Sequence, residues 1–181
     1  MSYKNSEGYD DPAAGEAFRA IRDLEKRQAR ERLRDLTWDD YGISRERYQE
    51  MRHFCLQYKA KRAEADSLTD ASAPAIRYDK IGSGGGFGGS PTETAAIRHA
   101  MRTEKARHDC RIIEESAMWA AAAAGYRHIW KALLFSVSEG LSYTQTMRRC
   151  GLPFGSTDFY GIRRAFFYRL DVLQTENEKV G

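Results

Sequence analysis

Cysteine is scarce in this sequence, and long apolar runs are absent. The 181 residues contain three cysteines, Cys55, Cys110 and Cys150, which stand far apart and form no Cys-x-x-Cys pair. Such a set predicts neither a disulfide framework nor a structural zinc site, and it fits a reducing compartment. The longest apolar run surrounds the alanines at 120–124 and is far shorter than the ~20 residues that span a bilayer. The first residues have no apolar core and predict no signal peptide. We therefore expect a cytoplasmic protein with no membrane, metal or cofactor.

A strong net charge is also absent. The formal charge is only +3, so a nucleic-acid contact would have to come from local clustering. The composition, 41% apolar and 30% charged, is typical of long solvated helices around a modest core, and it predicts an all-α fold. Between Tyr143 and Leu170 there are five arginines and one acid, Asp158, which gives a local charge of +4. The basic balance of the chain is thus concentrated near its C-terminal end.

The predicted organisation has four parts. Residues 1–12 form a disordered tail, and residues 13–67 form an N-terminal helical region whose second helix starts at the N-cap Ser44 and runs to about Ser67. Residues 68–90 form a Gly/Ser-rich linker, with six glycines in the nine positions from Gly82 to Ser90. The glycines fit no phosphate-binding pattern, because Gly-x-x-x-x-Gly-Lys-Ser/Thr is absent. Residues 91–181 form a C-terminal helical domain.

A helix from Pro91 to about Ala123 is predicted to open the C-terminal domain. Ser90, Pro91 and Glu93 form a capping box with proline at the first helical position. The expected apolar stripe recurs at three, four or seven residues, and His108 within it is interpreted as a packed side chain rather than a metal ligand. The stripe consists of Ile97, Met101, His108, Ile112, Ser116 and Trp119.

The last third of the chain has the pattern of a helix-turn-helix. A helix is predicted over 126–140, a short helix over 142–151, and a longer basic-aromatic helix from Ser156. At 100° per residue, one sector of this last helix carries the core positions Phe159, Ile162, Phe166, Leu170 and Leu173.

The opposite side of that helix is the predicted DNA-reading face. Arg164 could fork onto a guanine, and Gly161 could let the edge of the groove come close. Ser156 and Thr157 stand at the helix start, where phosphate is favoured, and Asp158 could accept from a cytosine amine or favour the helix N-terminus. The arginines at the flank and on the short helix suit phosphates. The complete predicted DNA-binding set is Arg148, Arg149, Ser156, Thr157, Asp158, Tyr160, Gly161, Arg163, Arg164 and Tyr168.

At these residues the chain resembles phage and prophage late-gene regulators of the RinA/ArpU type, whose C-terminal part is similar to region 4 of sigma-70 factors. The resemblance covers roughly residues 38–173. It is carried by the stretch from Tyr41 to Tyr58, the glycine-rich segment with Ser90-Pro91, and the stretch from Glu139 to Leu170. It implies promoter-proximal binding to double-stranded DNA, activation through contact with RNA polymerase, and a location on the nucleoid of a bacterial host cell.

Two other functions are open at this stage. A phage small terminase subunit also combines a helix-turn-helix with a linker and oligomerising helices. A protein-interaction module acting on host polymerase or another host system would bind no DNA. An enzyme is not expected, because Glu114 and Glu115 point about 100° apart on a helix and cannot form a dyad. Whether the N-terminal helices pair within one chain or in a homodimer is left open.

Overall fold

The computed structural model describes residues 12–70 and 91–178, and within these ranges it is helical with no strand. The all-α prediction is confirmed. Residues 1–11 of the predicted tail and residues 71–90 of the predicted linker lie outside the described residues. Ser90, the predicted cap, is one of them. The elements are α1 (Pro12–Asp35), α2 (Arg45–Leu56), α3 (Tyr58–Asp70), α4 (Pro91–Ala123), the 3-10 turn η1 (Arg127–Ile129), α5 (Trp130–Ser138), α6 (Tyr143–Cys150) and α7 (Ser156–Glu178).

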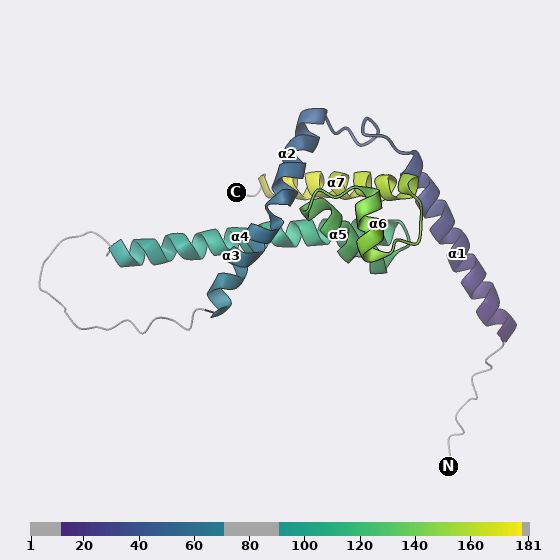
Figure 1. Cartoon of the computed structure of the whole chain (residues 1–181), viewed down its shortest axis with the longest axis horizontal. Coiled ribbons are helices and arrows are strands. Elements are labelled where there is room, and N and C mark those ends of the chain that lie inside the picture. Colours follow the sequence, from purple (N-terminus) through teal and green to yellow (C-terminus); the bar gives the residue numbers. More distant parts are fainter. Residues whose placement is uncertain (1–11, 71–90, 179–181) are drawn as a thin grey trace, which may run out of the picture.

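Helices α4 and α7 lie side by side in opposite directions and form the centre of the fold (Figure 1). Helix α3 packs along α4, α5 packs against the C-terminal part of α4, and α1 packs against α7. None of the described helices is long and apolar enough to cross a membrane.

The core face of α7 lies where the sequence predicts it. Phe159, Ile162, Phe166 and Leu170 are at most 1% exposed, and Leu173 is 9% exposed. These side chains belong to one cluster that also contains residues from the N-terminal region and from α4. The predicted N-terminal region and C-terminal domain therefore share a single hydrophobic core. Its N-terminal members are Ile43, Met51 and Cys55.

The predicted stripe on α4 is wrong in most of its positions. Ile97, Met101 and Trp119 are exposed, and of the predicted set only Ile112 and Ser116 are buried. The buried row consists mainly of small side chains at alternating spacings of three and four, which let the neighbouring helices approach α4 closely. This row is Thr103, Ala106, Cys110, Ile113, Ala117, Ala120 and Ala124.

The second predicted helix is two helices. Ser44 is the N-cap, as predicted, and its hydroxyl accepts a hydrogen bond from the Arg47 N–H at 3.1 Å. The helix ends at Leu56, because the N–H of Gln57 turns to the carbonyl of Phe54, three residues back, at 3.3 Å. This tighter turn separates α2 from α3.

Candidate nucleic-acid interface

Helices α5, α6 and α7 form the predicted helix-turn-helix, and local signals set their ends. Ser142 caps α6: its Oγ accepts from the Gln145 N–H at 3.4 Å, and Gln145 Oε1 accepts from the Ser142 N–H at 2.9 Å. This capping box satisfies two backbone donors that the helix leaves free. Gly151 ends α6 with a φ of 64°, a conformation that costs glycine little.

The turn between α6 and α7 is pinned to the core. Leu152 and Phe154 in this turn are buried. The Tyr143 hydroxyl, on α6, donates to the carbonyl of Phe154 at 2.9 Å. The N–H of Leu152 lies 3.1 Å from the sulfur of Met147. Because Tyr143 and Met147 both belong to α6, these contacts fix the position of the turn against that helix.

Five of the predicted DNA-binding residues are exposed where α6 ends and α7 begins. Arg148 and Arg149 are exposed on α6, and Arg148 has no ion-pair or hydrogen-bond partner among the described residues. The Arg149 guanidinium lies 5.6 Å from the centre of the Phe135 ring. Ser156 and Thr157 are exposed in the first turn of α7, where a helix has unpaired N–H groups. The fifth residue is Tyr160, whose side chain is 40% exposed.

Three other predicted residues, Arg164, Asp158 and Gly161, face α1 instead of solvent. Arg164 donates from Nε to the carbonyl of Leu36 at 2.7 Å and from Nη2 to the carbonyl of Arg34 at 3.0 Å. Its planar fork therefore binds the C-terminal carbonyls of α1, not a base. A carboxylate oxygen of Asp158 lies 3.4 Å from Arg30 Nε, so this acid is paired with α1. In the described conformation, neither side chain is free to enter a groove.

The close approach that we assigned to a DNA groove at Gly161 is made by α1. A Cβ at this position would lie 2.7 Å from the carbonyl oxygen of Leu33 and 2.9 Å from the backbone N and Cα of Arg34. Only glycine accommodates backbone this near. Gly161 is therefore the contact point between two helices.

The last two predicted residues lie further along α7. Arg163 is 9% exposed and donates to the carbonyl of Leu141 at 2.9 Å, so it binds the turn before α6 rather than a phosphate. Tyr168 is 37% exposed, and its ring centre lies 5.0 Å from that of Tyr41. Burial raises the pKa of Tyr41 above its ordinary value.

These contacts reduce the local charge that the sequence displays. Arg169 pairs with Glu115 at 3.1 Å, and Arg163 and Arg164 bind backbone carbonyls. Of the five arginines in the basic segment, Arg148 and Arg149 are those directed outward without a carboxylate or carbonyl partner among the described residues. A nucleic acid meeting this conformation would therefore contact two arginines from the segment.

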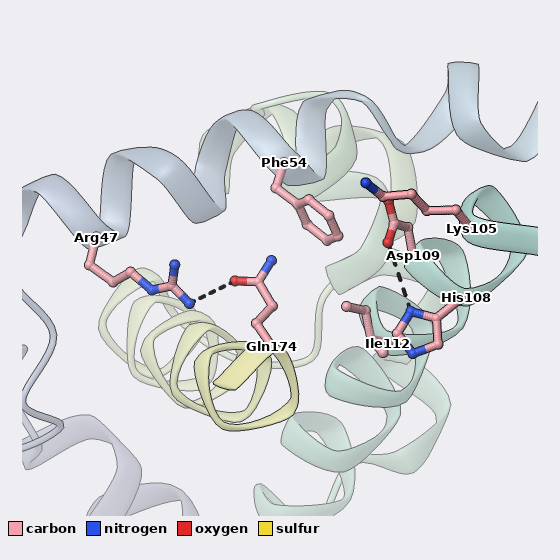
Figure 2. Close-up of a pocket in the computed structure, with 7 residues that line it drawn as sticks. All are labelled: Arg47, Phe54, Lys105, His108, Asp109, Ile112 and Gln174. Carbon is pink, nitrogen blue, oxygen red and sulfur yellow. Dashed lines mark hydrogen bonds and ion pairs between the residues drawn. The ribbon is translucent and has the colours of Figure 1, made fainter. Parts of the chain in front are cut away.

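A separate cleft of about 360 Å³ lies between α2, α4 and α7 (Figure 2). Its charged groups are largely paired: Arg47 binds Asp171 at 2.6 Å, and Asp109 binds Lys61 at 2.8 Å. His108 is half-buried, with Nδ1 3.8 Å from the Asp109 carboxylate. Within the described ranges, no group of three or more His, Cys, Asp or Glu is placed to hold a metal ion.

The carboxylates considered for catalysis have separate partners. Glu114 accepts hydrogen bonds from the Tyr58 hydroxyl and from Arg62, which belong to α3. Glu115 pairs with Arg169 on α7. The two acids thus make ion-pair contacts to different helices, which agrees with the interpretation that they form no dyad.

The role of α1 is the feature that sequence reasoning missed. The signal was Gly161 itself, because a glycine inside a helix usually has a packing or functional reason. Its partner, however, is separated from it by more than a hundred residues.

Comparison of the chain with family models, with curated proteins and with solved structures gives no match.

Proposed function

We propose that this protein binds double-stranded DNA and regulates transcription, with α6 and the first turn of α7 as the contact surface. The observation that carries the proposal is a set of exposed groups on the helix-turn-helix: two arginines in the last turn of α6, and the hydroxyls and unpaired N–H groups at the N-terminus of α7. Backbone N–H groups and hydroxyls at a helix start favour a phosphate, and exposed guanidinium groups form strong hydrogen bonds to phosphates.

Each exposed residue has a role in this proposal. Arg148 and Arg149 contact phosphates, which sets position and orientation but not sequence. Ser156 binds the phosphate at the start of α7. Thr157 and Tyr160, on the exposed side of the first turns, are the groups that can touch base edges. The sequence resemblance adds the expectation of a phage or prophage late operon as target and of RNA polymerase as partner.

The number of free arginines predicts the salt dependence. Two phosphate contacts give a slope of about −1.8 in log K against log salt, which is a loss of roughly ten-fold between 50 and 200 mM. This dependence is shallow for a DNA-binding protein, and it separates the described conformation from one in which more arginines reach the DNA.

The test is fluorescence-anisotropy binding to ~30-bp duplexes from the genomic neighbourhood, with random duplex as competitor, at two salt concentrations. The double variant Arg148→Ala/Arg149→Ala should bind every duplex about ten-fold more weakly at low salt and with a flatter salt slope. The matched control is Arg98→Ala/Arg102→Ala, which removes the same charge from exposed positions on α4. Equal loss in both variants would show that general charge, and not this surface, holds the DNA.

A small terminase subunit is the second candidate. It is favoured by the exposed apolar side chains Ile97 and Met101, 54% and 69% exposed on the N-terminal half of α4, which could pack between copies. Solution mass by light scattering decides between them. A ring of roughly eight or more subunits supports the terminase, whereas a monomer or dimer supports the regulator. No DNA binding at any salt concentration would overturn both and favour a protein-interaction module.

A further inference from the structure

The C-terminal part of α1 packs against the N-terminal part of α7 (Figure 1). Charged side chains hold the contact at both of its ends. At one end Arg30 pairs with Asp158, and at the other Arg164 donates to the carbonyls at the C-terminal end of α1. Between them, the backbone of α1 sits against Gly161. Arg30 also donates from Nη1 to the Tyr126 hydroxyl at 2.9 Å. On α7 the contact therefore extends from Asp158, in the first turn, to Arg164.

Over residues 22–36, where burial is described, little apolar burial holds α1 in this place. From Arg22 to Leu36 no described side chain is fully buried, and Leu24 is 55% exposed. Leu33 is only partly buried against the core. Because apolar burial supplies most of the stability of a packed helix, one held mainly by polar contacts can leave at small cost. Such a helix belongs to the low-stability end of a structure.

The chain immediately after α1 is anchored independently of it. Trp38 packs its ring 4.7 Å from that of Tyr48 and 6.0 Å from that of Phe167. Asp40 accepts hydrogen bonds from the N–H and the hydroxyl of Thr37, both at 2.7 Å. Helix α1 can thus swing away at residues 35–37 while the segment beyond stays on the core.

We propose that α1 is a removable cover of the DNA-reading helix, so that α1 and DNA compete for the same face of α7. This inference rests on the proposed function. In the covered state the protein offers DNA Arg148, Arg149 and the first turn of α7. When α1 leaves, Arg164 and the strip of α7 around Gly161 become available to the groove as well. The cover thereby sets the strength of DNA binding.

The competition has a quantitative consequence. If only a fraction of molecules is uncovered, the observed dissociation constant of the extended contact is the intrinsic one divided by that fraction. Loosening α1 should therefore tighten DNA binding. It should also steepen the salt slope by about one unit, because Arg164 becomes an additional phosphate or base contact.

The experiment uses the full chain with Arg30→Glu, which turns the attraction to Asp158 into repulsion. The matched control is Arg27→Glu, the same charge change on the same helix, at an exposed side chain with no ion-pair or hydrogen-bond partner among the described residues. Hydrogen exchange of the amides of residues 22–35 reports whether α1 has left. Anisotropy with the duplexes used above reports DNA affinity and its salt slope.

We expect Arg30→Glu to speed exchange in α1 and to bind DNA about ten-fold more tightly, with the steeper slope, while Arg27→Glu does neither. The sign is informative, because removing positive charge otherwise weakens DNA binding. Weaker binding by both variants would overturn the proposal and make α1 a DNA-contacting arm.

Three further outcomes are decisive. Unchanged exchange in Arg30→Glu overturns the proposal, because the contacts assigned to hold α1 would not hold it. Faster exchange with unchanged affinity overturns the cover but leaves the proposed function standing, provided that the parent binds DNA. If neither the parent nor Arg30→Glu binds any duplex although α1 exchanges fast, the proposed function itself fails, and the cover fails with it.

Discussion

Replacement of Gly161 by alanine tests most directly whether α1 packs against this position of α7. The added methyl group would lie 2.7 Å from the Leu33 carbonyl oxygen and 2.9 Å from the backbone of Arg34, whereas ordinary contacts begin at 3.4 Å. The obstructing atoms belong to the main chain and cannot rotate away. Helix α1 would therefore have to move outward by about 0.5 to 0.7 Å, the differences between these distances and ordinary contact.

The size of the effect follows from what that movement breaks. The two hydrogen bonds from Arg164 to α1, at 2.7 and 3.0 Å, would lengthen towards or beyond the usual limit of about 3.2 Å. Losing one bond from a charged donor costs about 1.5 kcal/mol, which corresponds to roughly ten-fold faster amide exchange in α1. Helix α7 itself gains, because alanine is favoured over glycine in a helix interior by about 1 kcal/mol.

The expected result is thus a local effect without a global one. Hydrogen exchange followed by mass spectrometry should show faster exchange over residues 22–35 and unchanged exchange over α4. The free energy of unfolding in urea should fall by only about 0.5 kcal/mol, because the gain of about 1 kcal/mol in α7 offsets most of the loss of about 1.5 kcal/mol at the contact with α1. Gly155→Ala is the control, since a Cβ there meets nothing within 4 Å.

Two results would refute this reasoning. Unchanged exchange in α1 would mean that the helix does not rest on Gly161. A loss of several kcal/mol in global stability would mean that α1 is an integral part of the fold and not a separable cover.

Two further predictions concern stability. Ser142→Ala removes the cap of α6 and should lower the free energy of unfolding in urea by about 1 kcal/mol, whereas Thr144→Ala, at an exposed position of the same helix, should change it by less than about 0.5 kcal/mol. Burial raises the pKa of the Cys110 thiol to about 11, so the unfolded chain loses this proton first and stability should fall as the pH rises from about 9 to about 11. Urea titrations at pH 8 and pH 10.5 should show a smaller fall for Cys110→Ala, and equal falls in variant and parent would contradict this assignment. Cys150→Ala is the exposed-thiol control.

Local signals made the helix ends predictable from the sequence. Ser44 caps a helix as expected, and the short helix expected over 142–151 lies between its cap Ser142 and Gly151, because each of these residues acts on backbone groups within a few residues. The core face of α7 was also predictable, since large apolar side chains at helical spacing define a single sector. Those features required no knowledge of distant contacts.

The errors came from residues whose partners are small or remote. The buried side of α4 carries Ala117 and Ala120, whose burial contributes little to a hydrophobic pattern dominated by Met101 and Trp119. The role of Arg164 depends on carbonyls at the end of α1, and a backbone acceptor leaves no trace in the composition of a segment. A count of arginines therefore overstates the charge that reaches the surface.

The separation in sequence between α1 and its contact site on α7 also has a consequence during synthesis of the chain. The bond from Arg164 to Leu36 joins residues 128 positions apart. At about 5 to 20 residues per second, the ribosome needs about 6 to 26 s to make the chain between them. Helix α1 is thus made before α7 and can pack in its place only after Arg164 has been added to the chain. Every newly made chain would pass through a period in which α1 has no α7 to rest on.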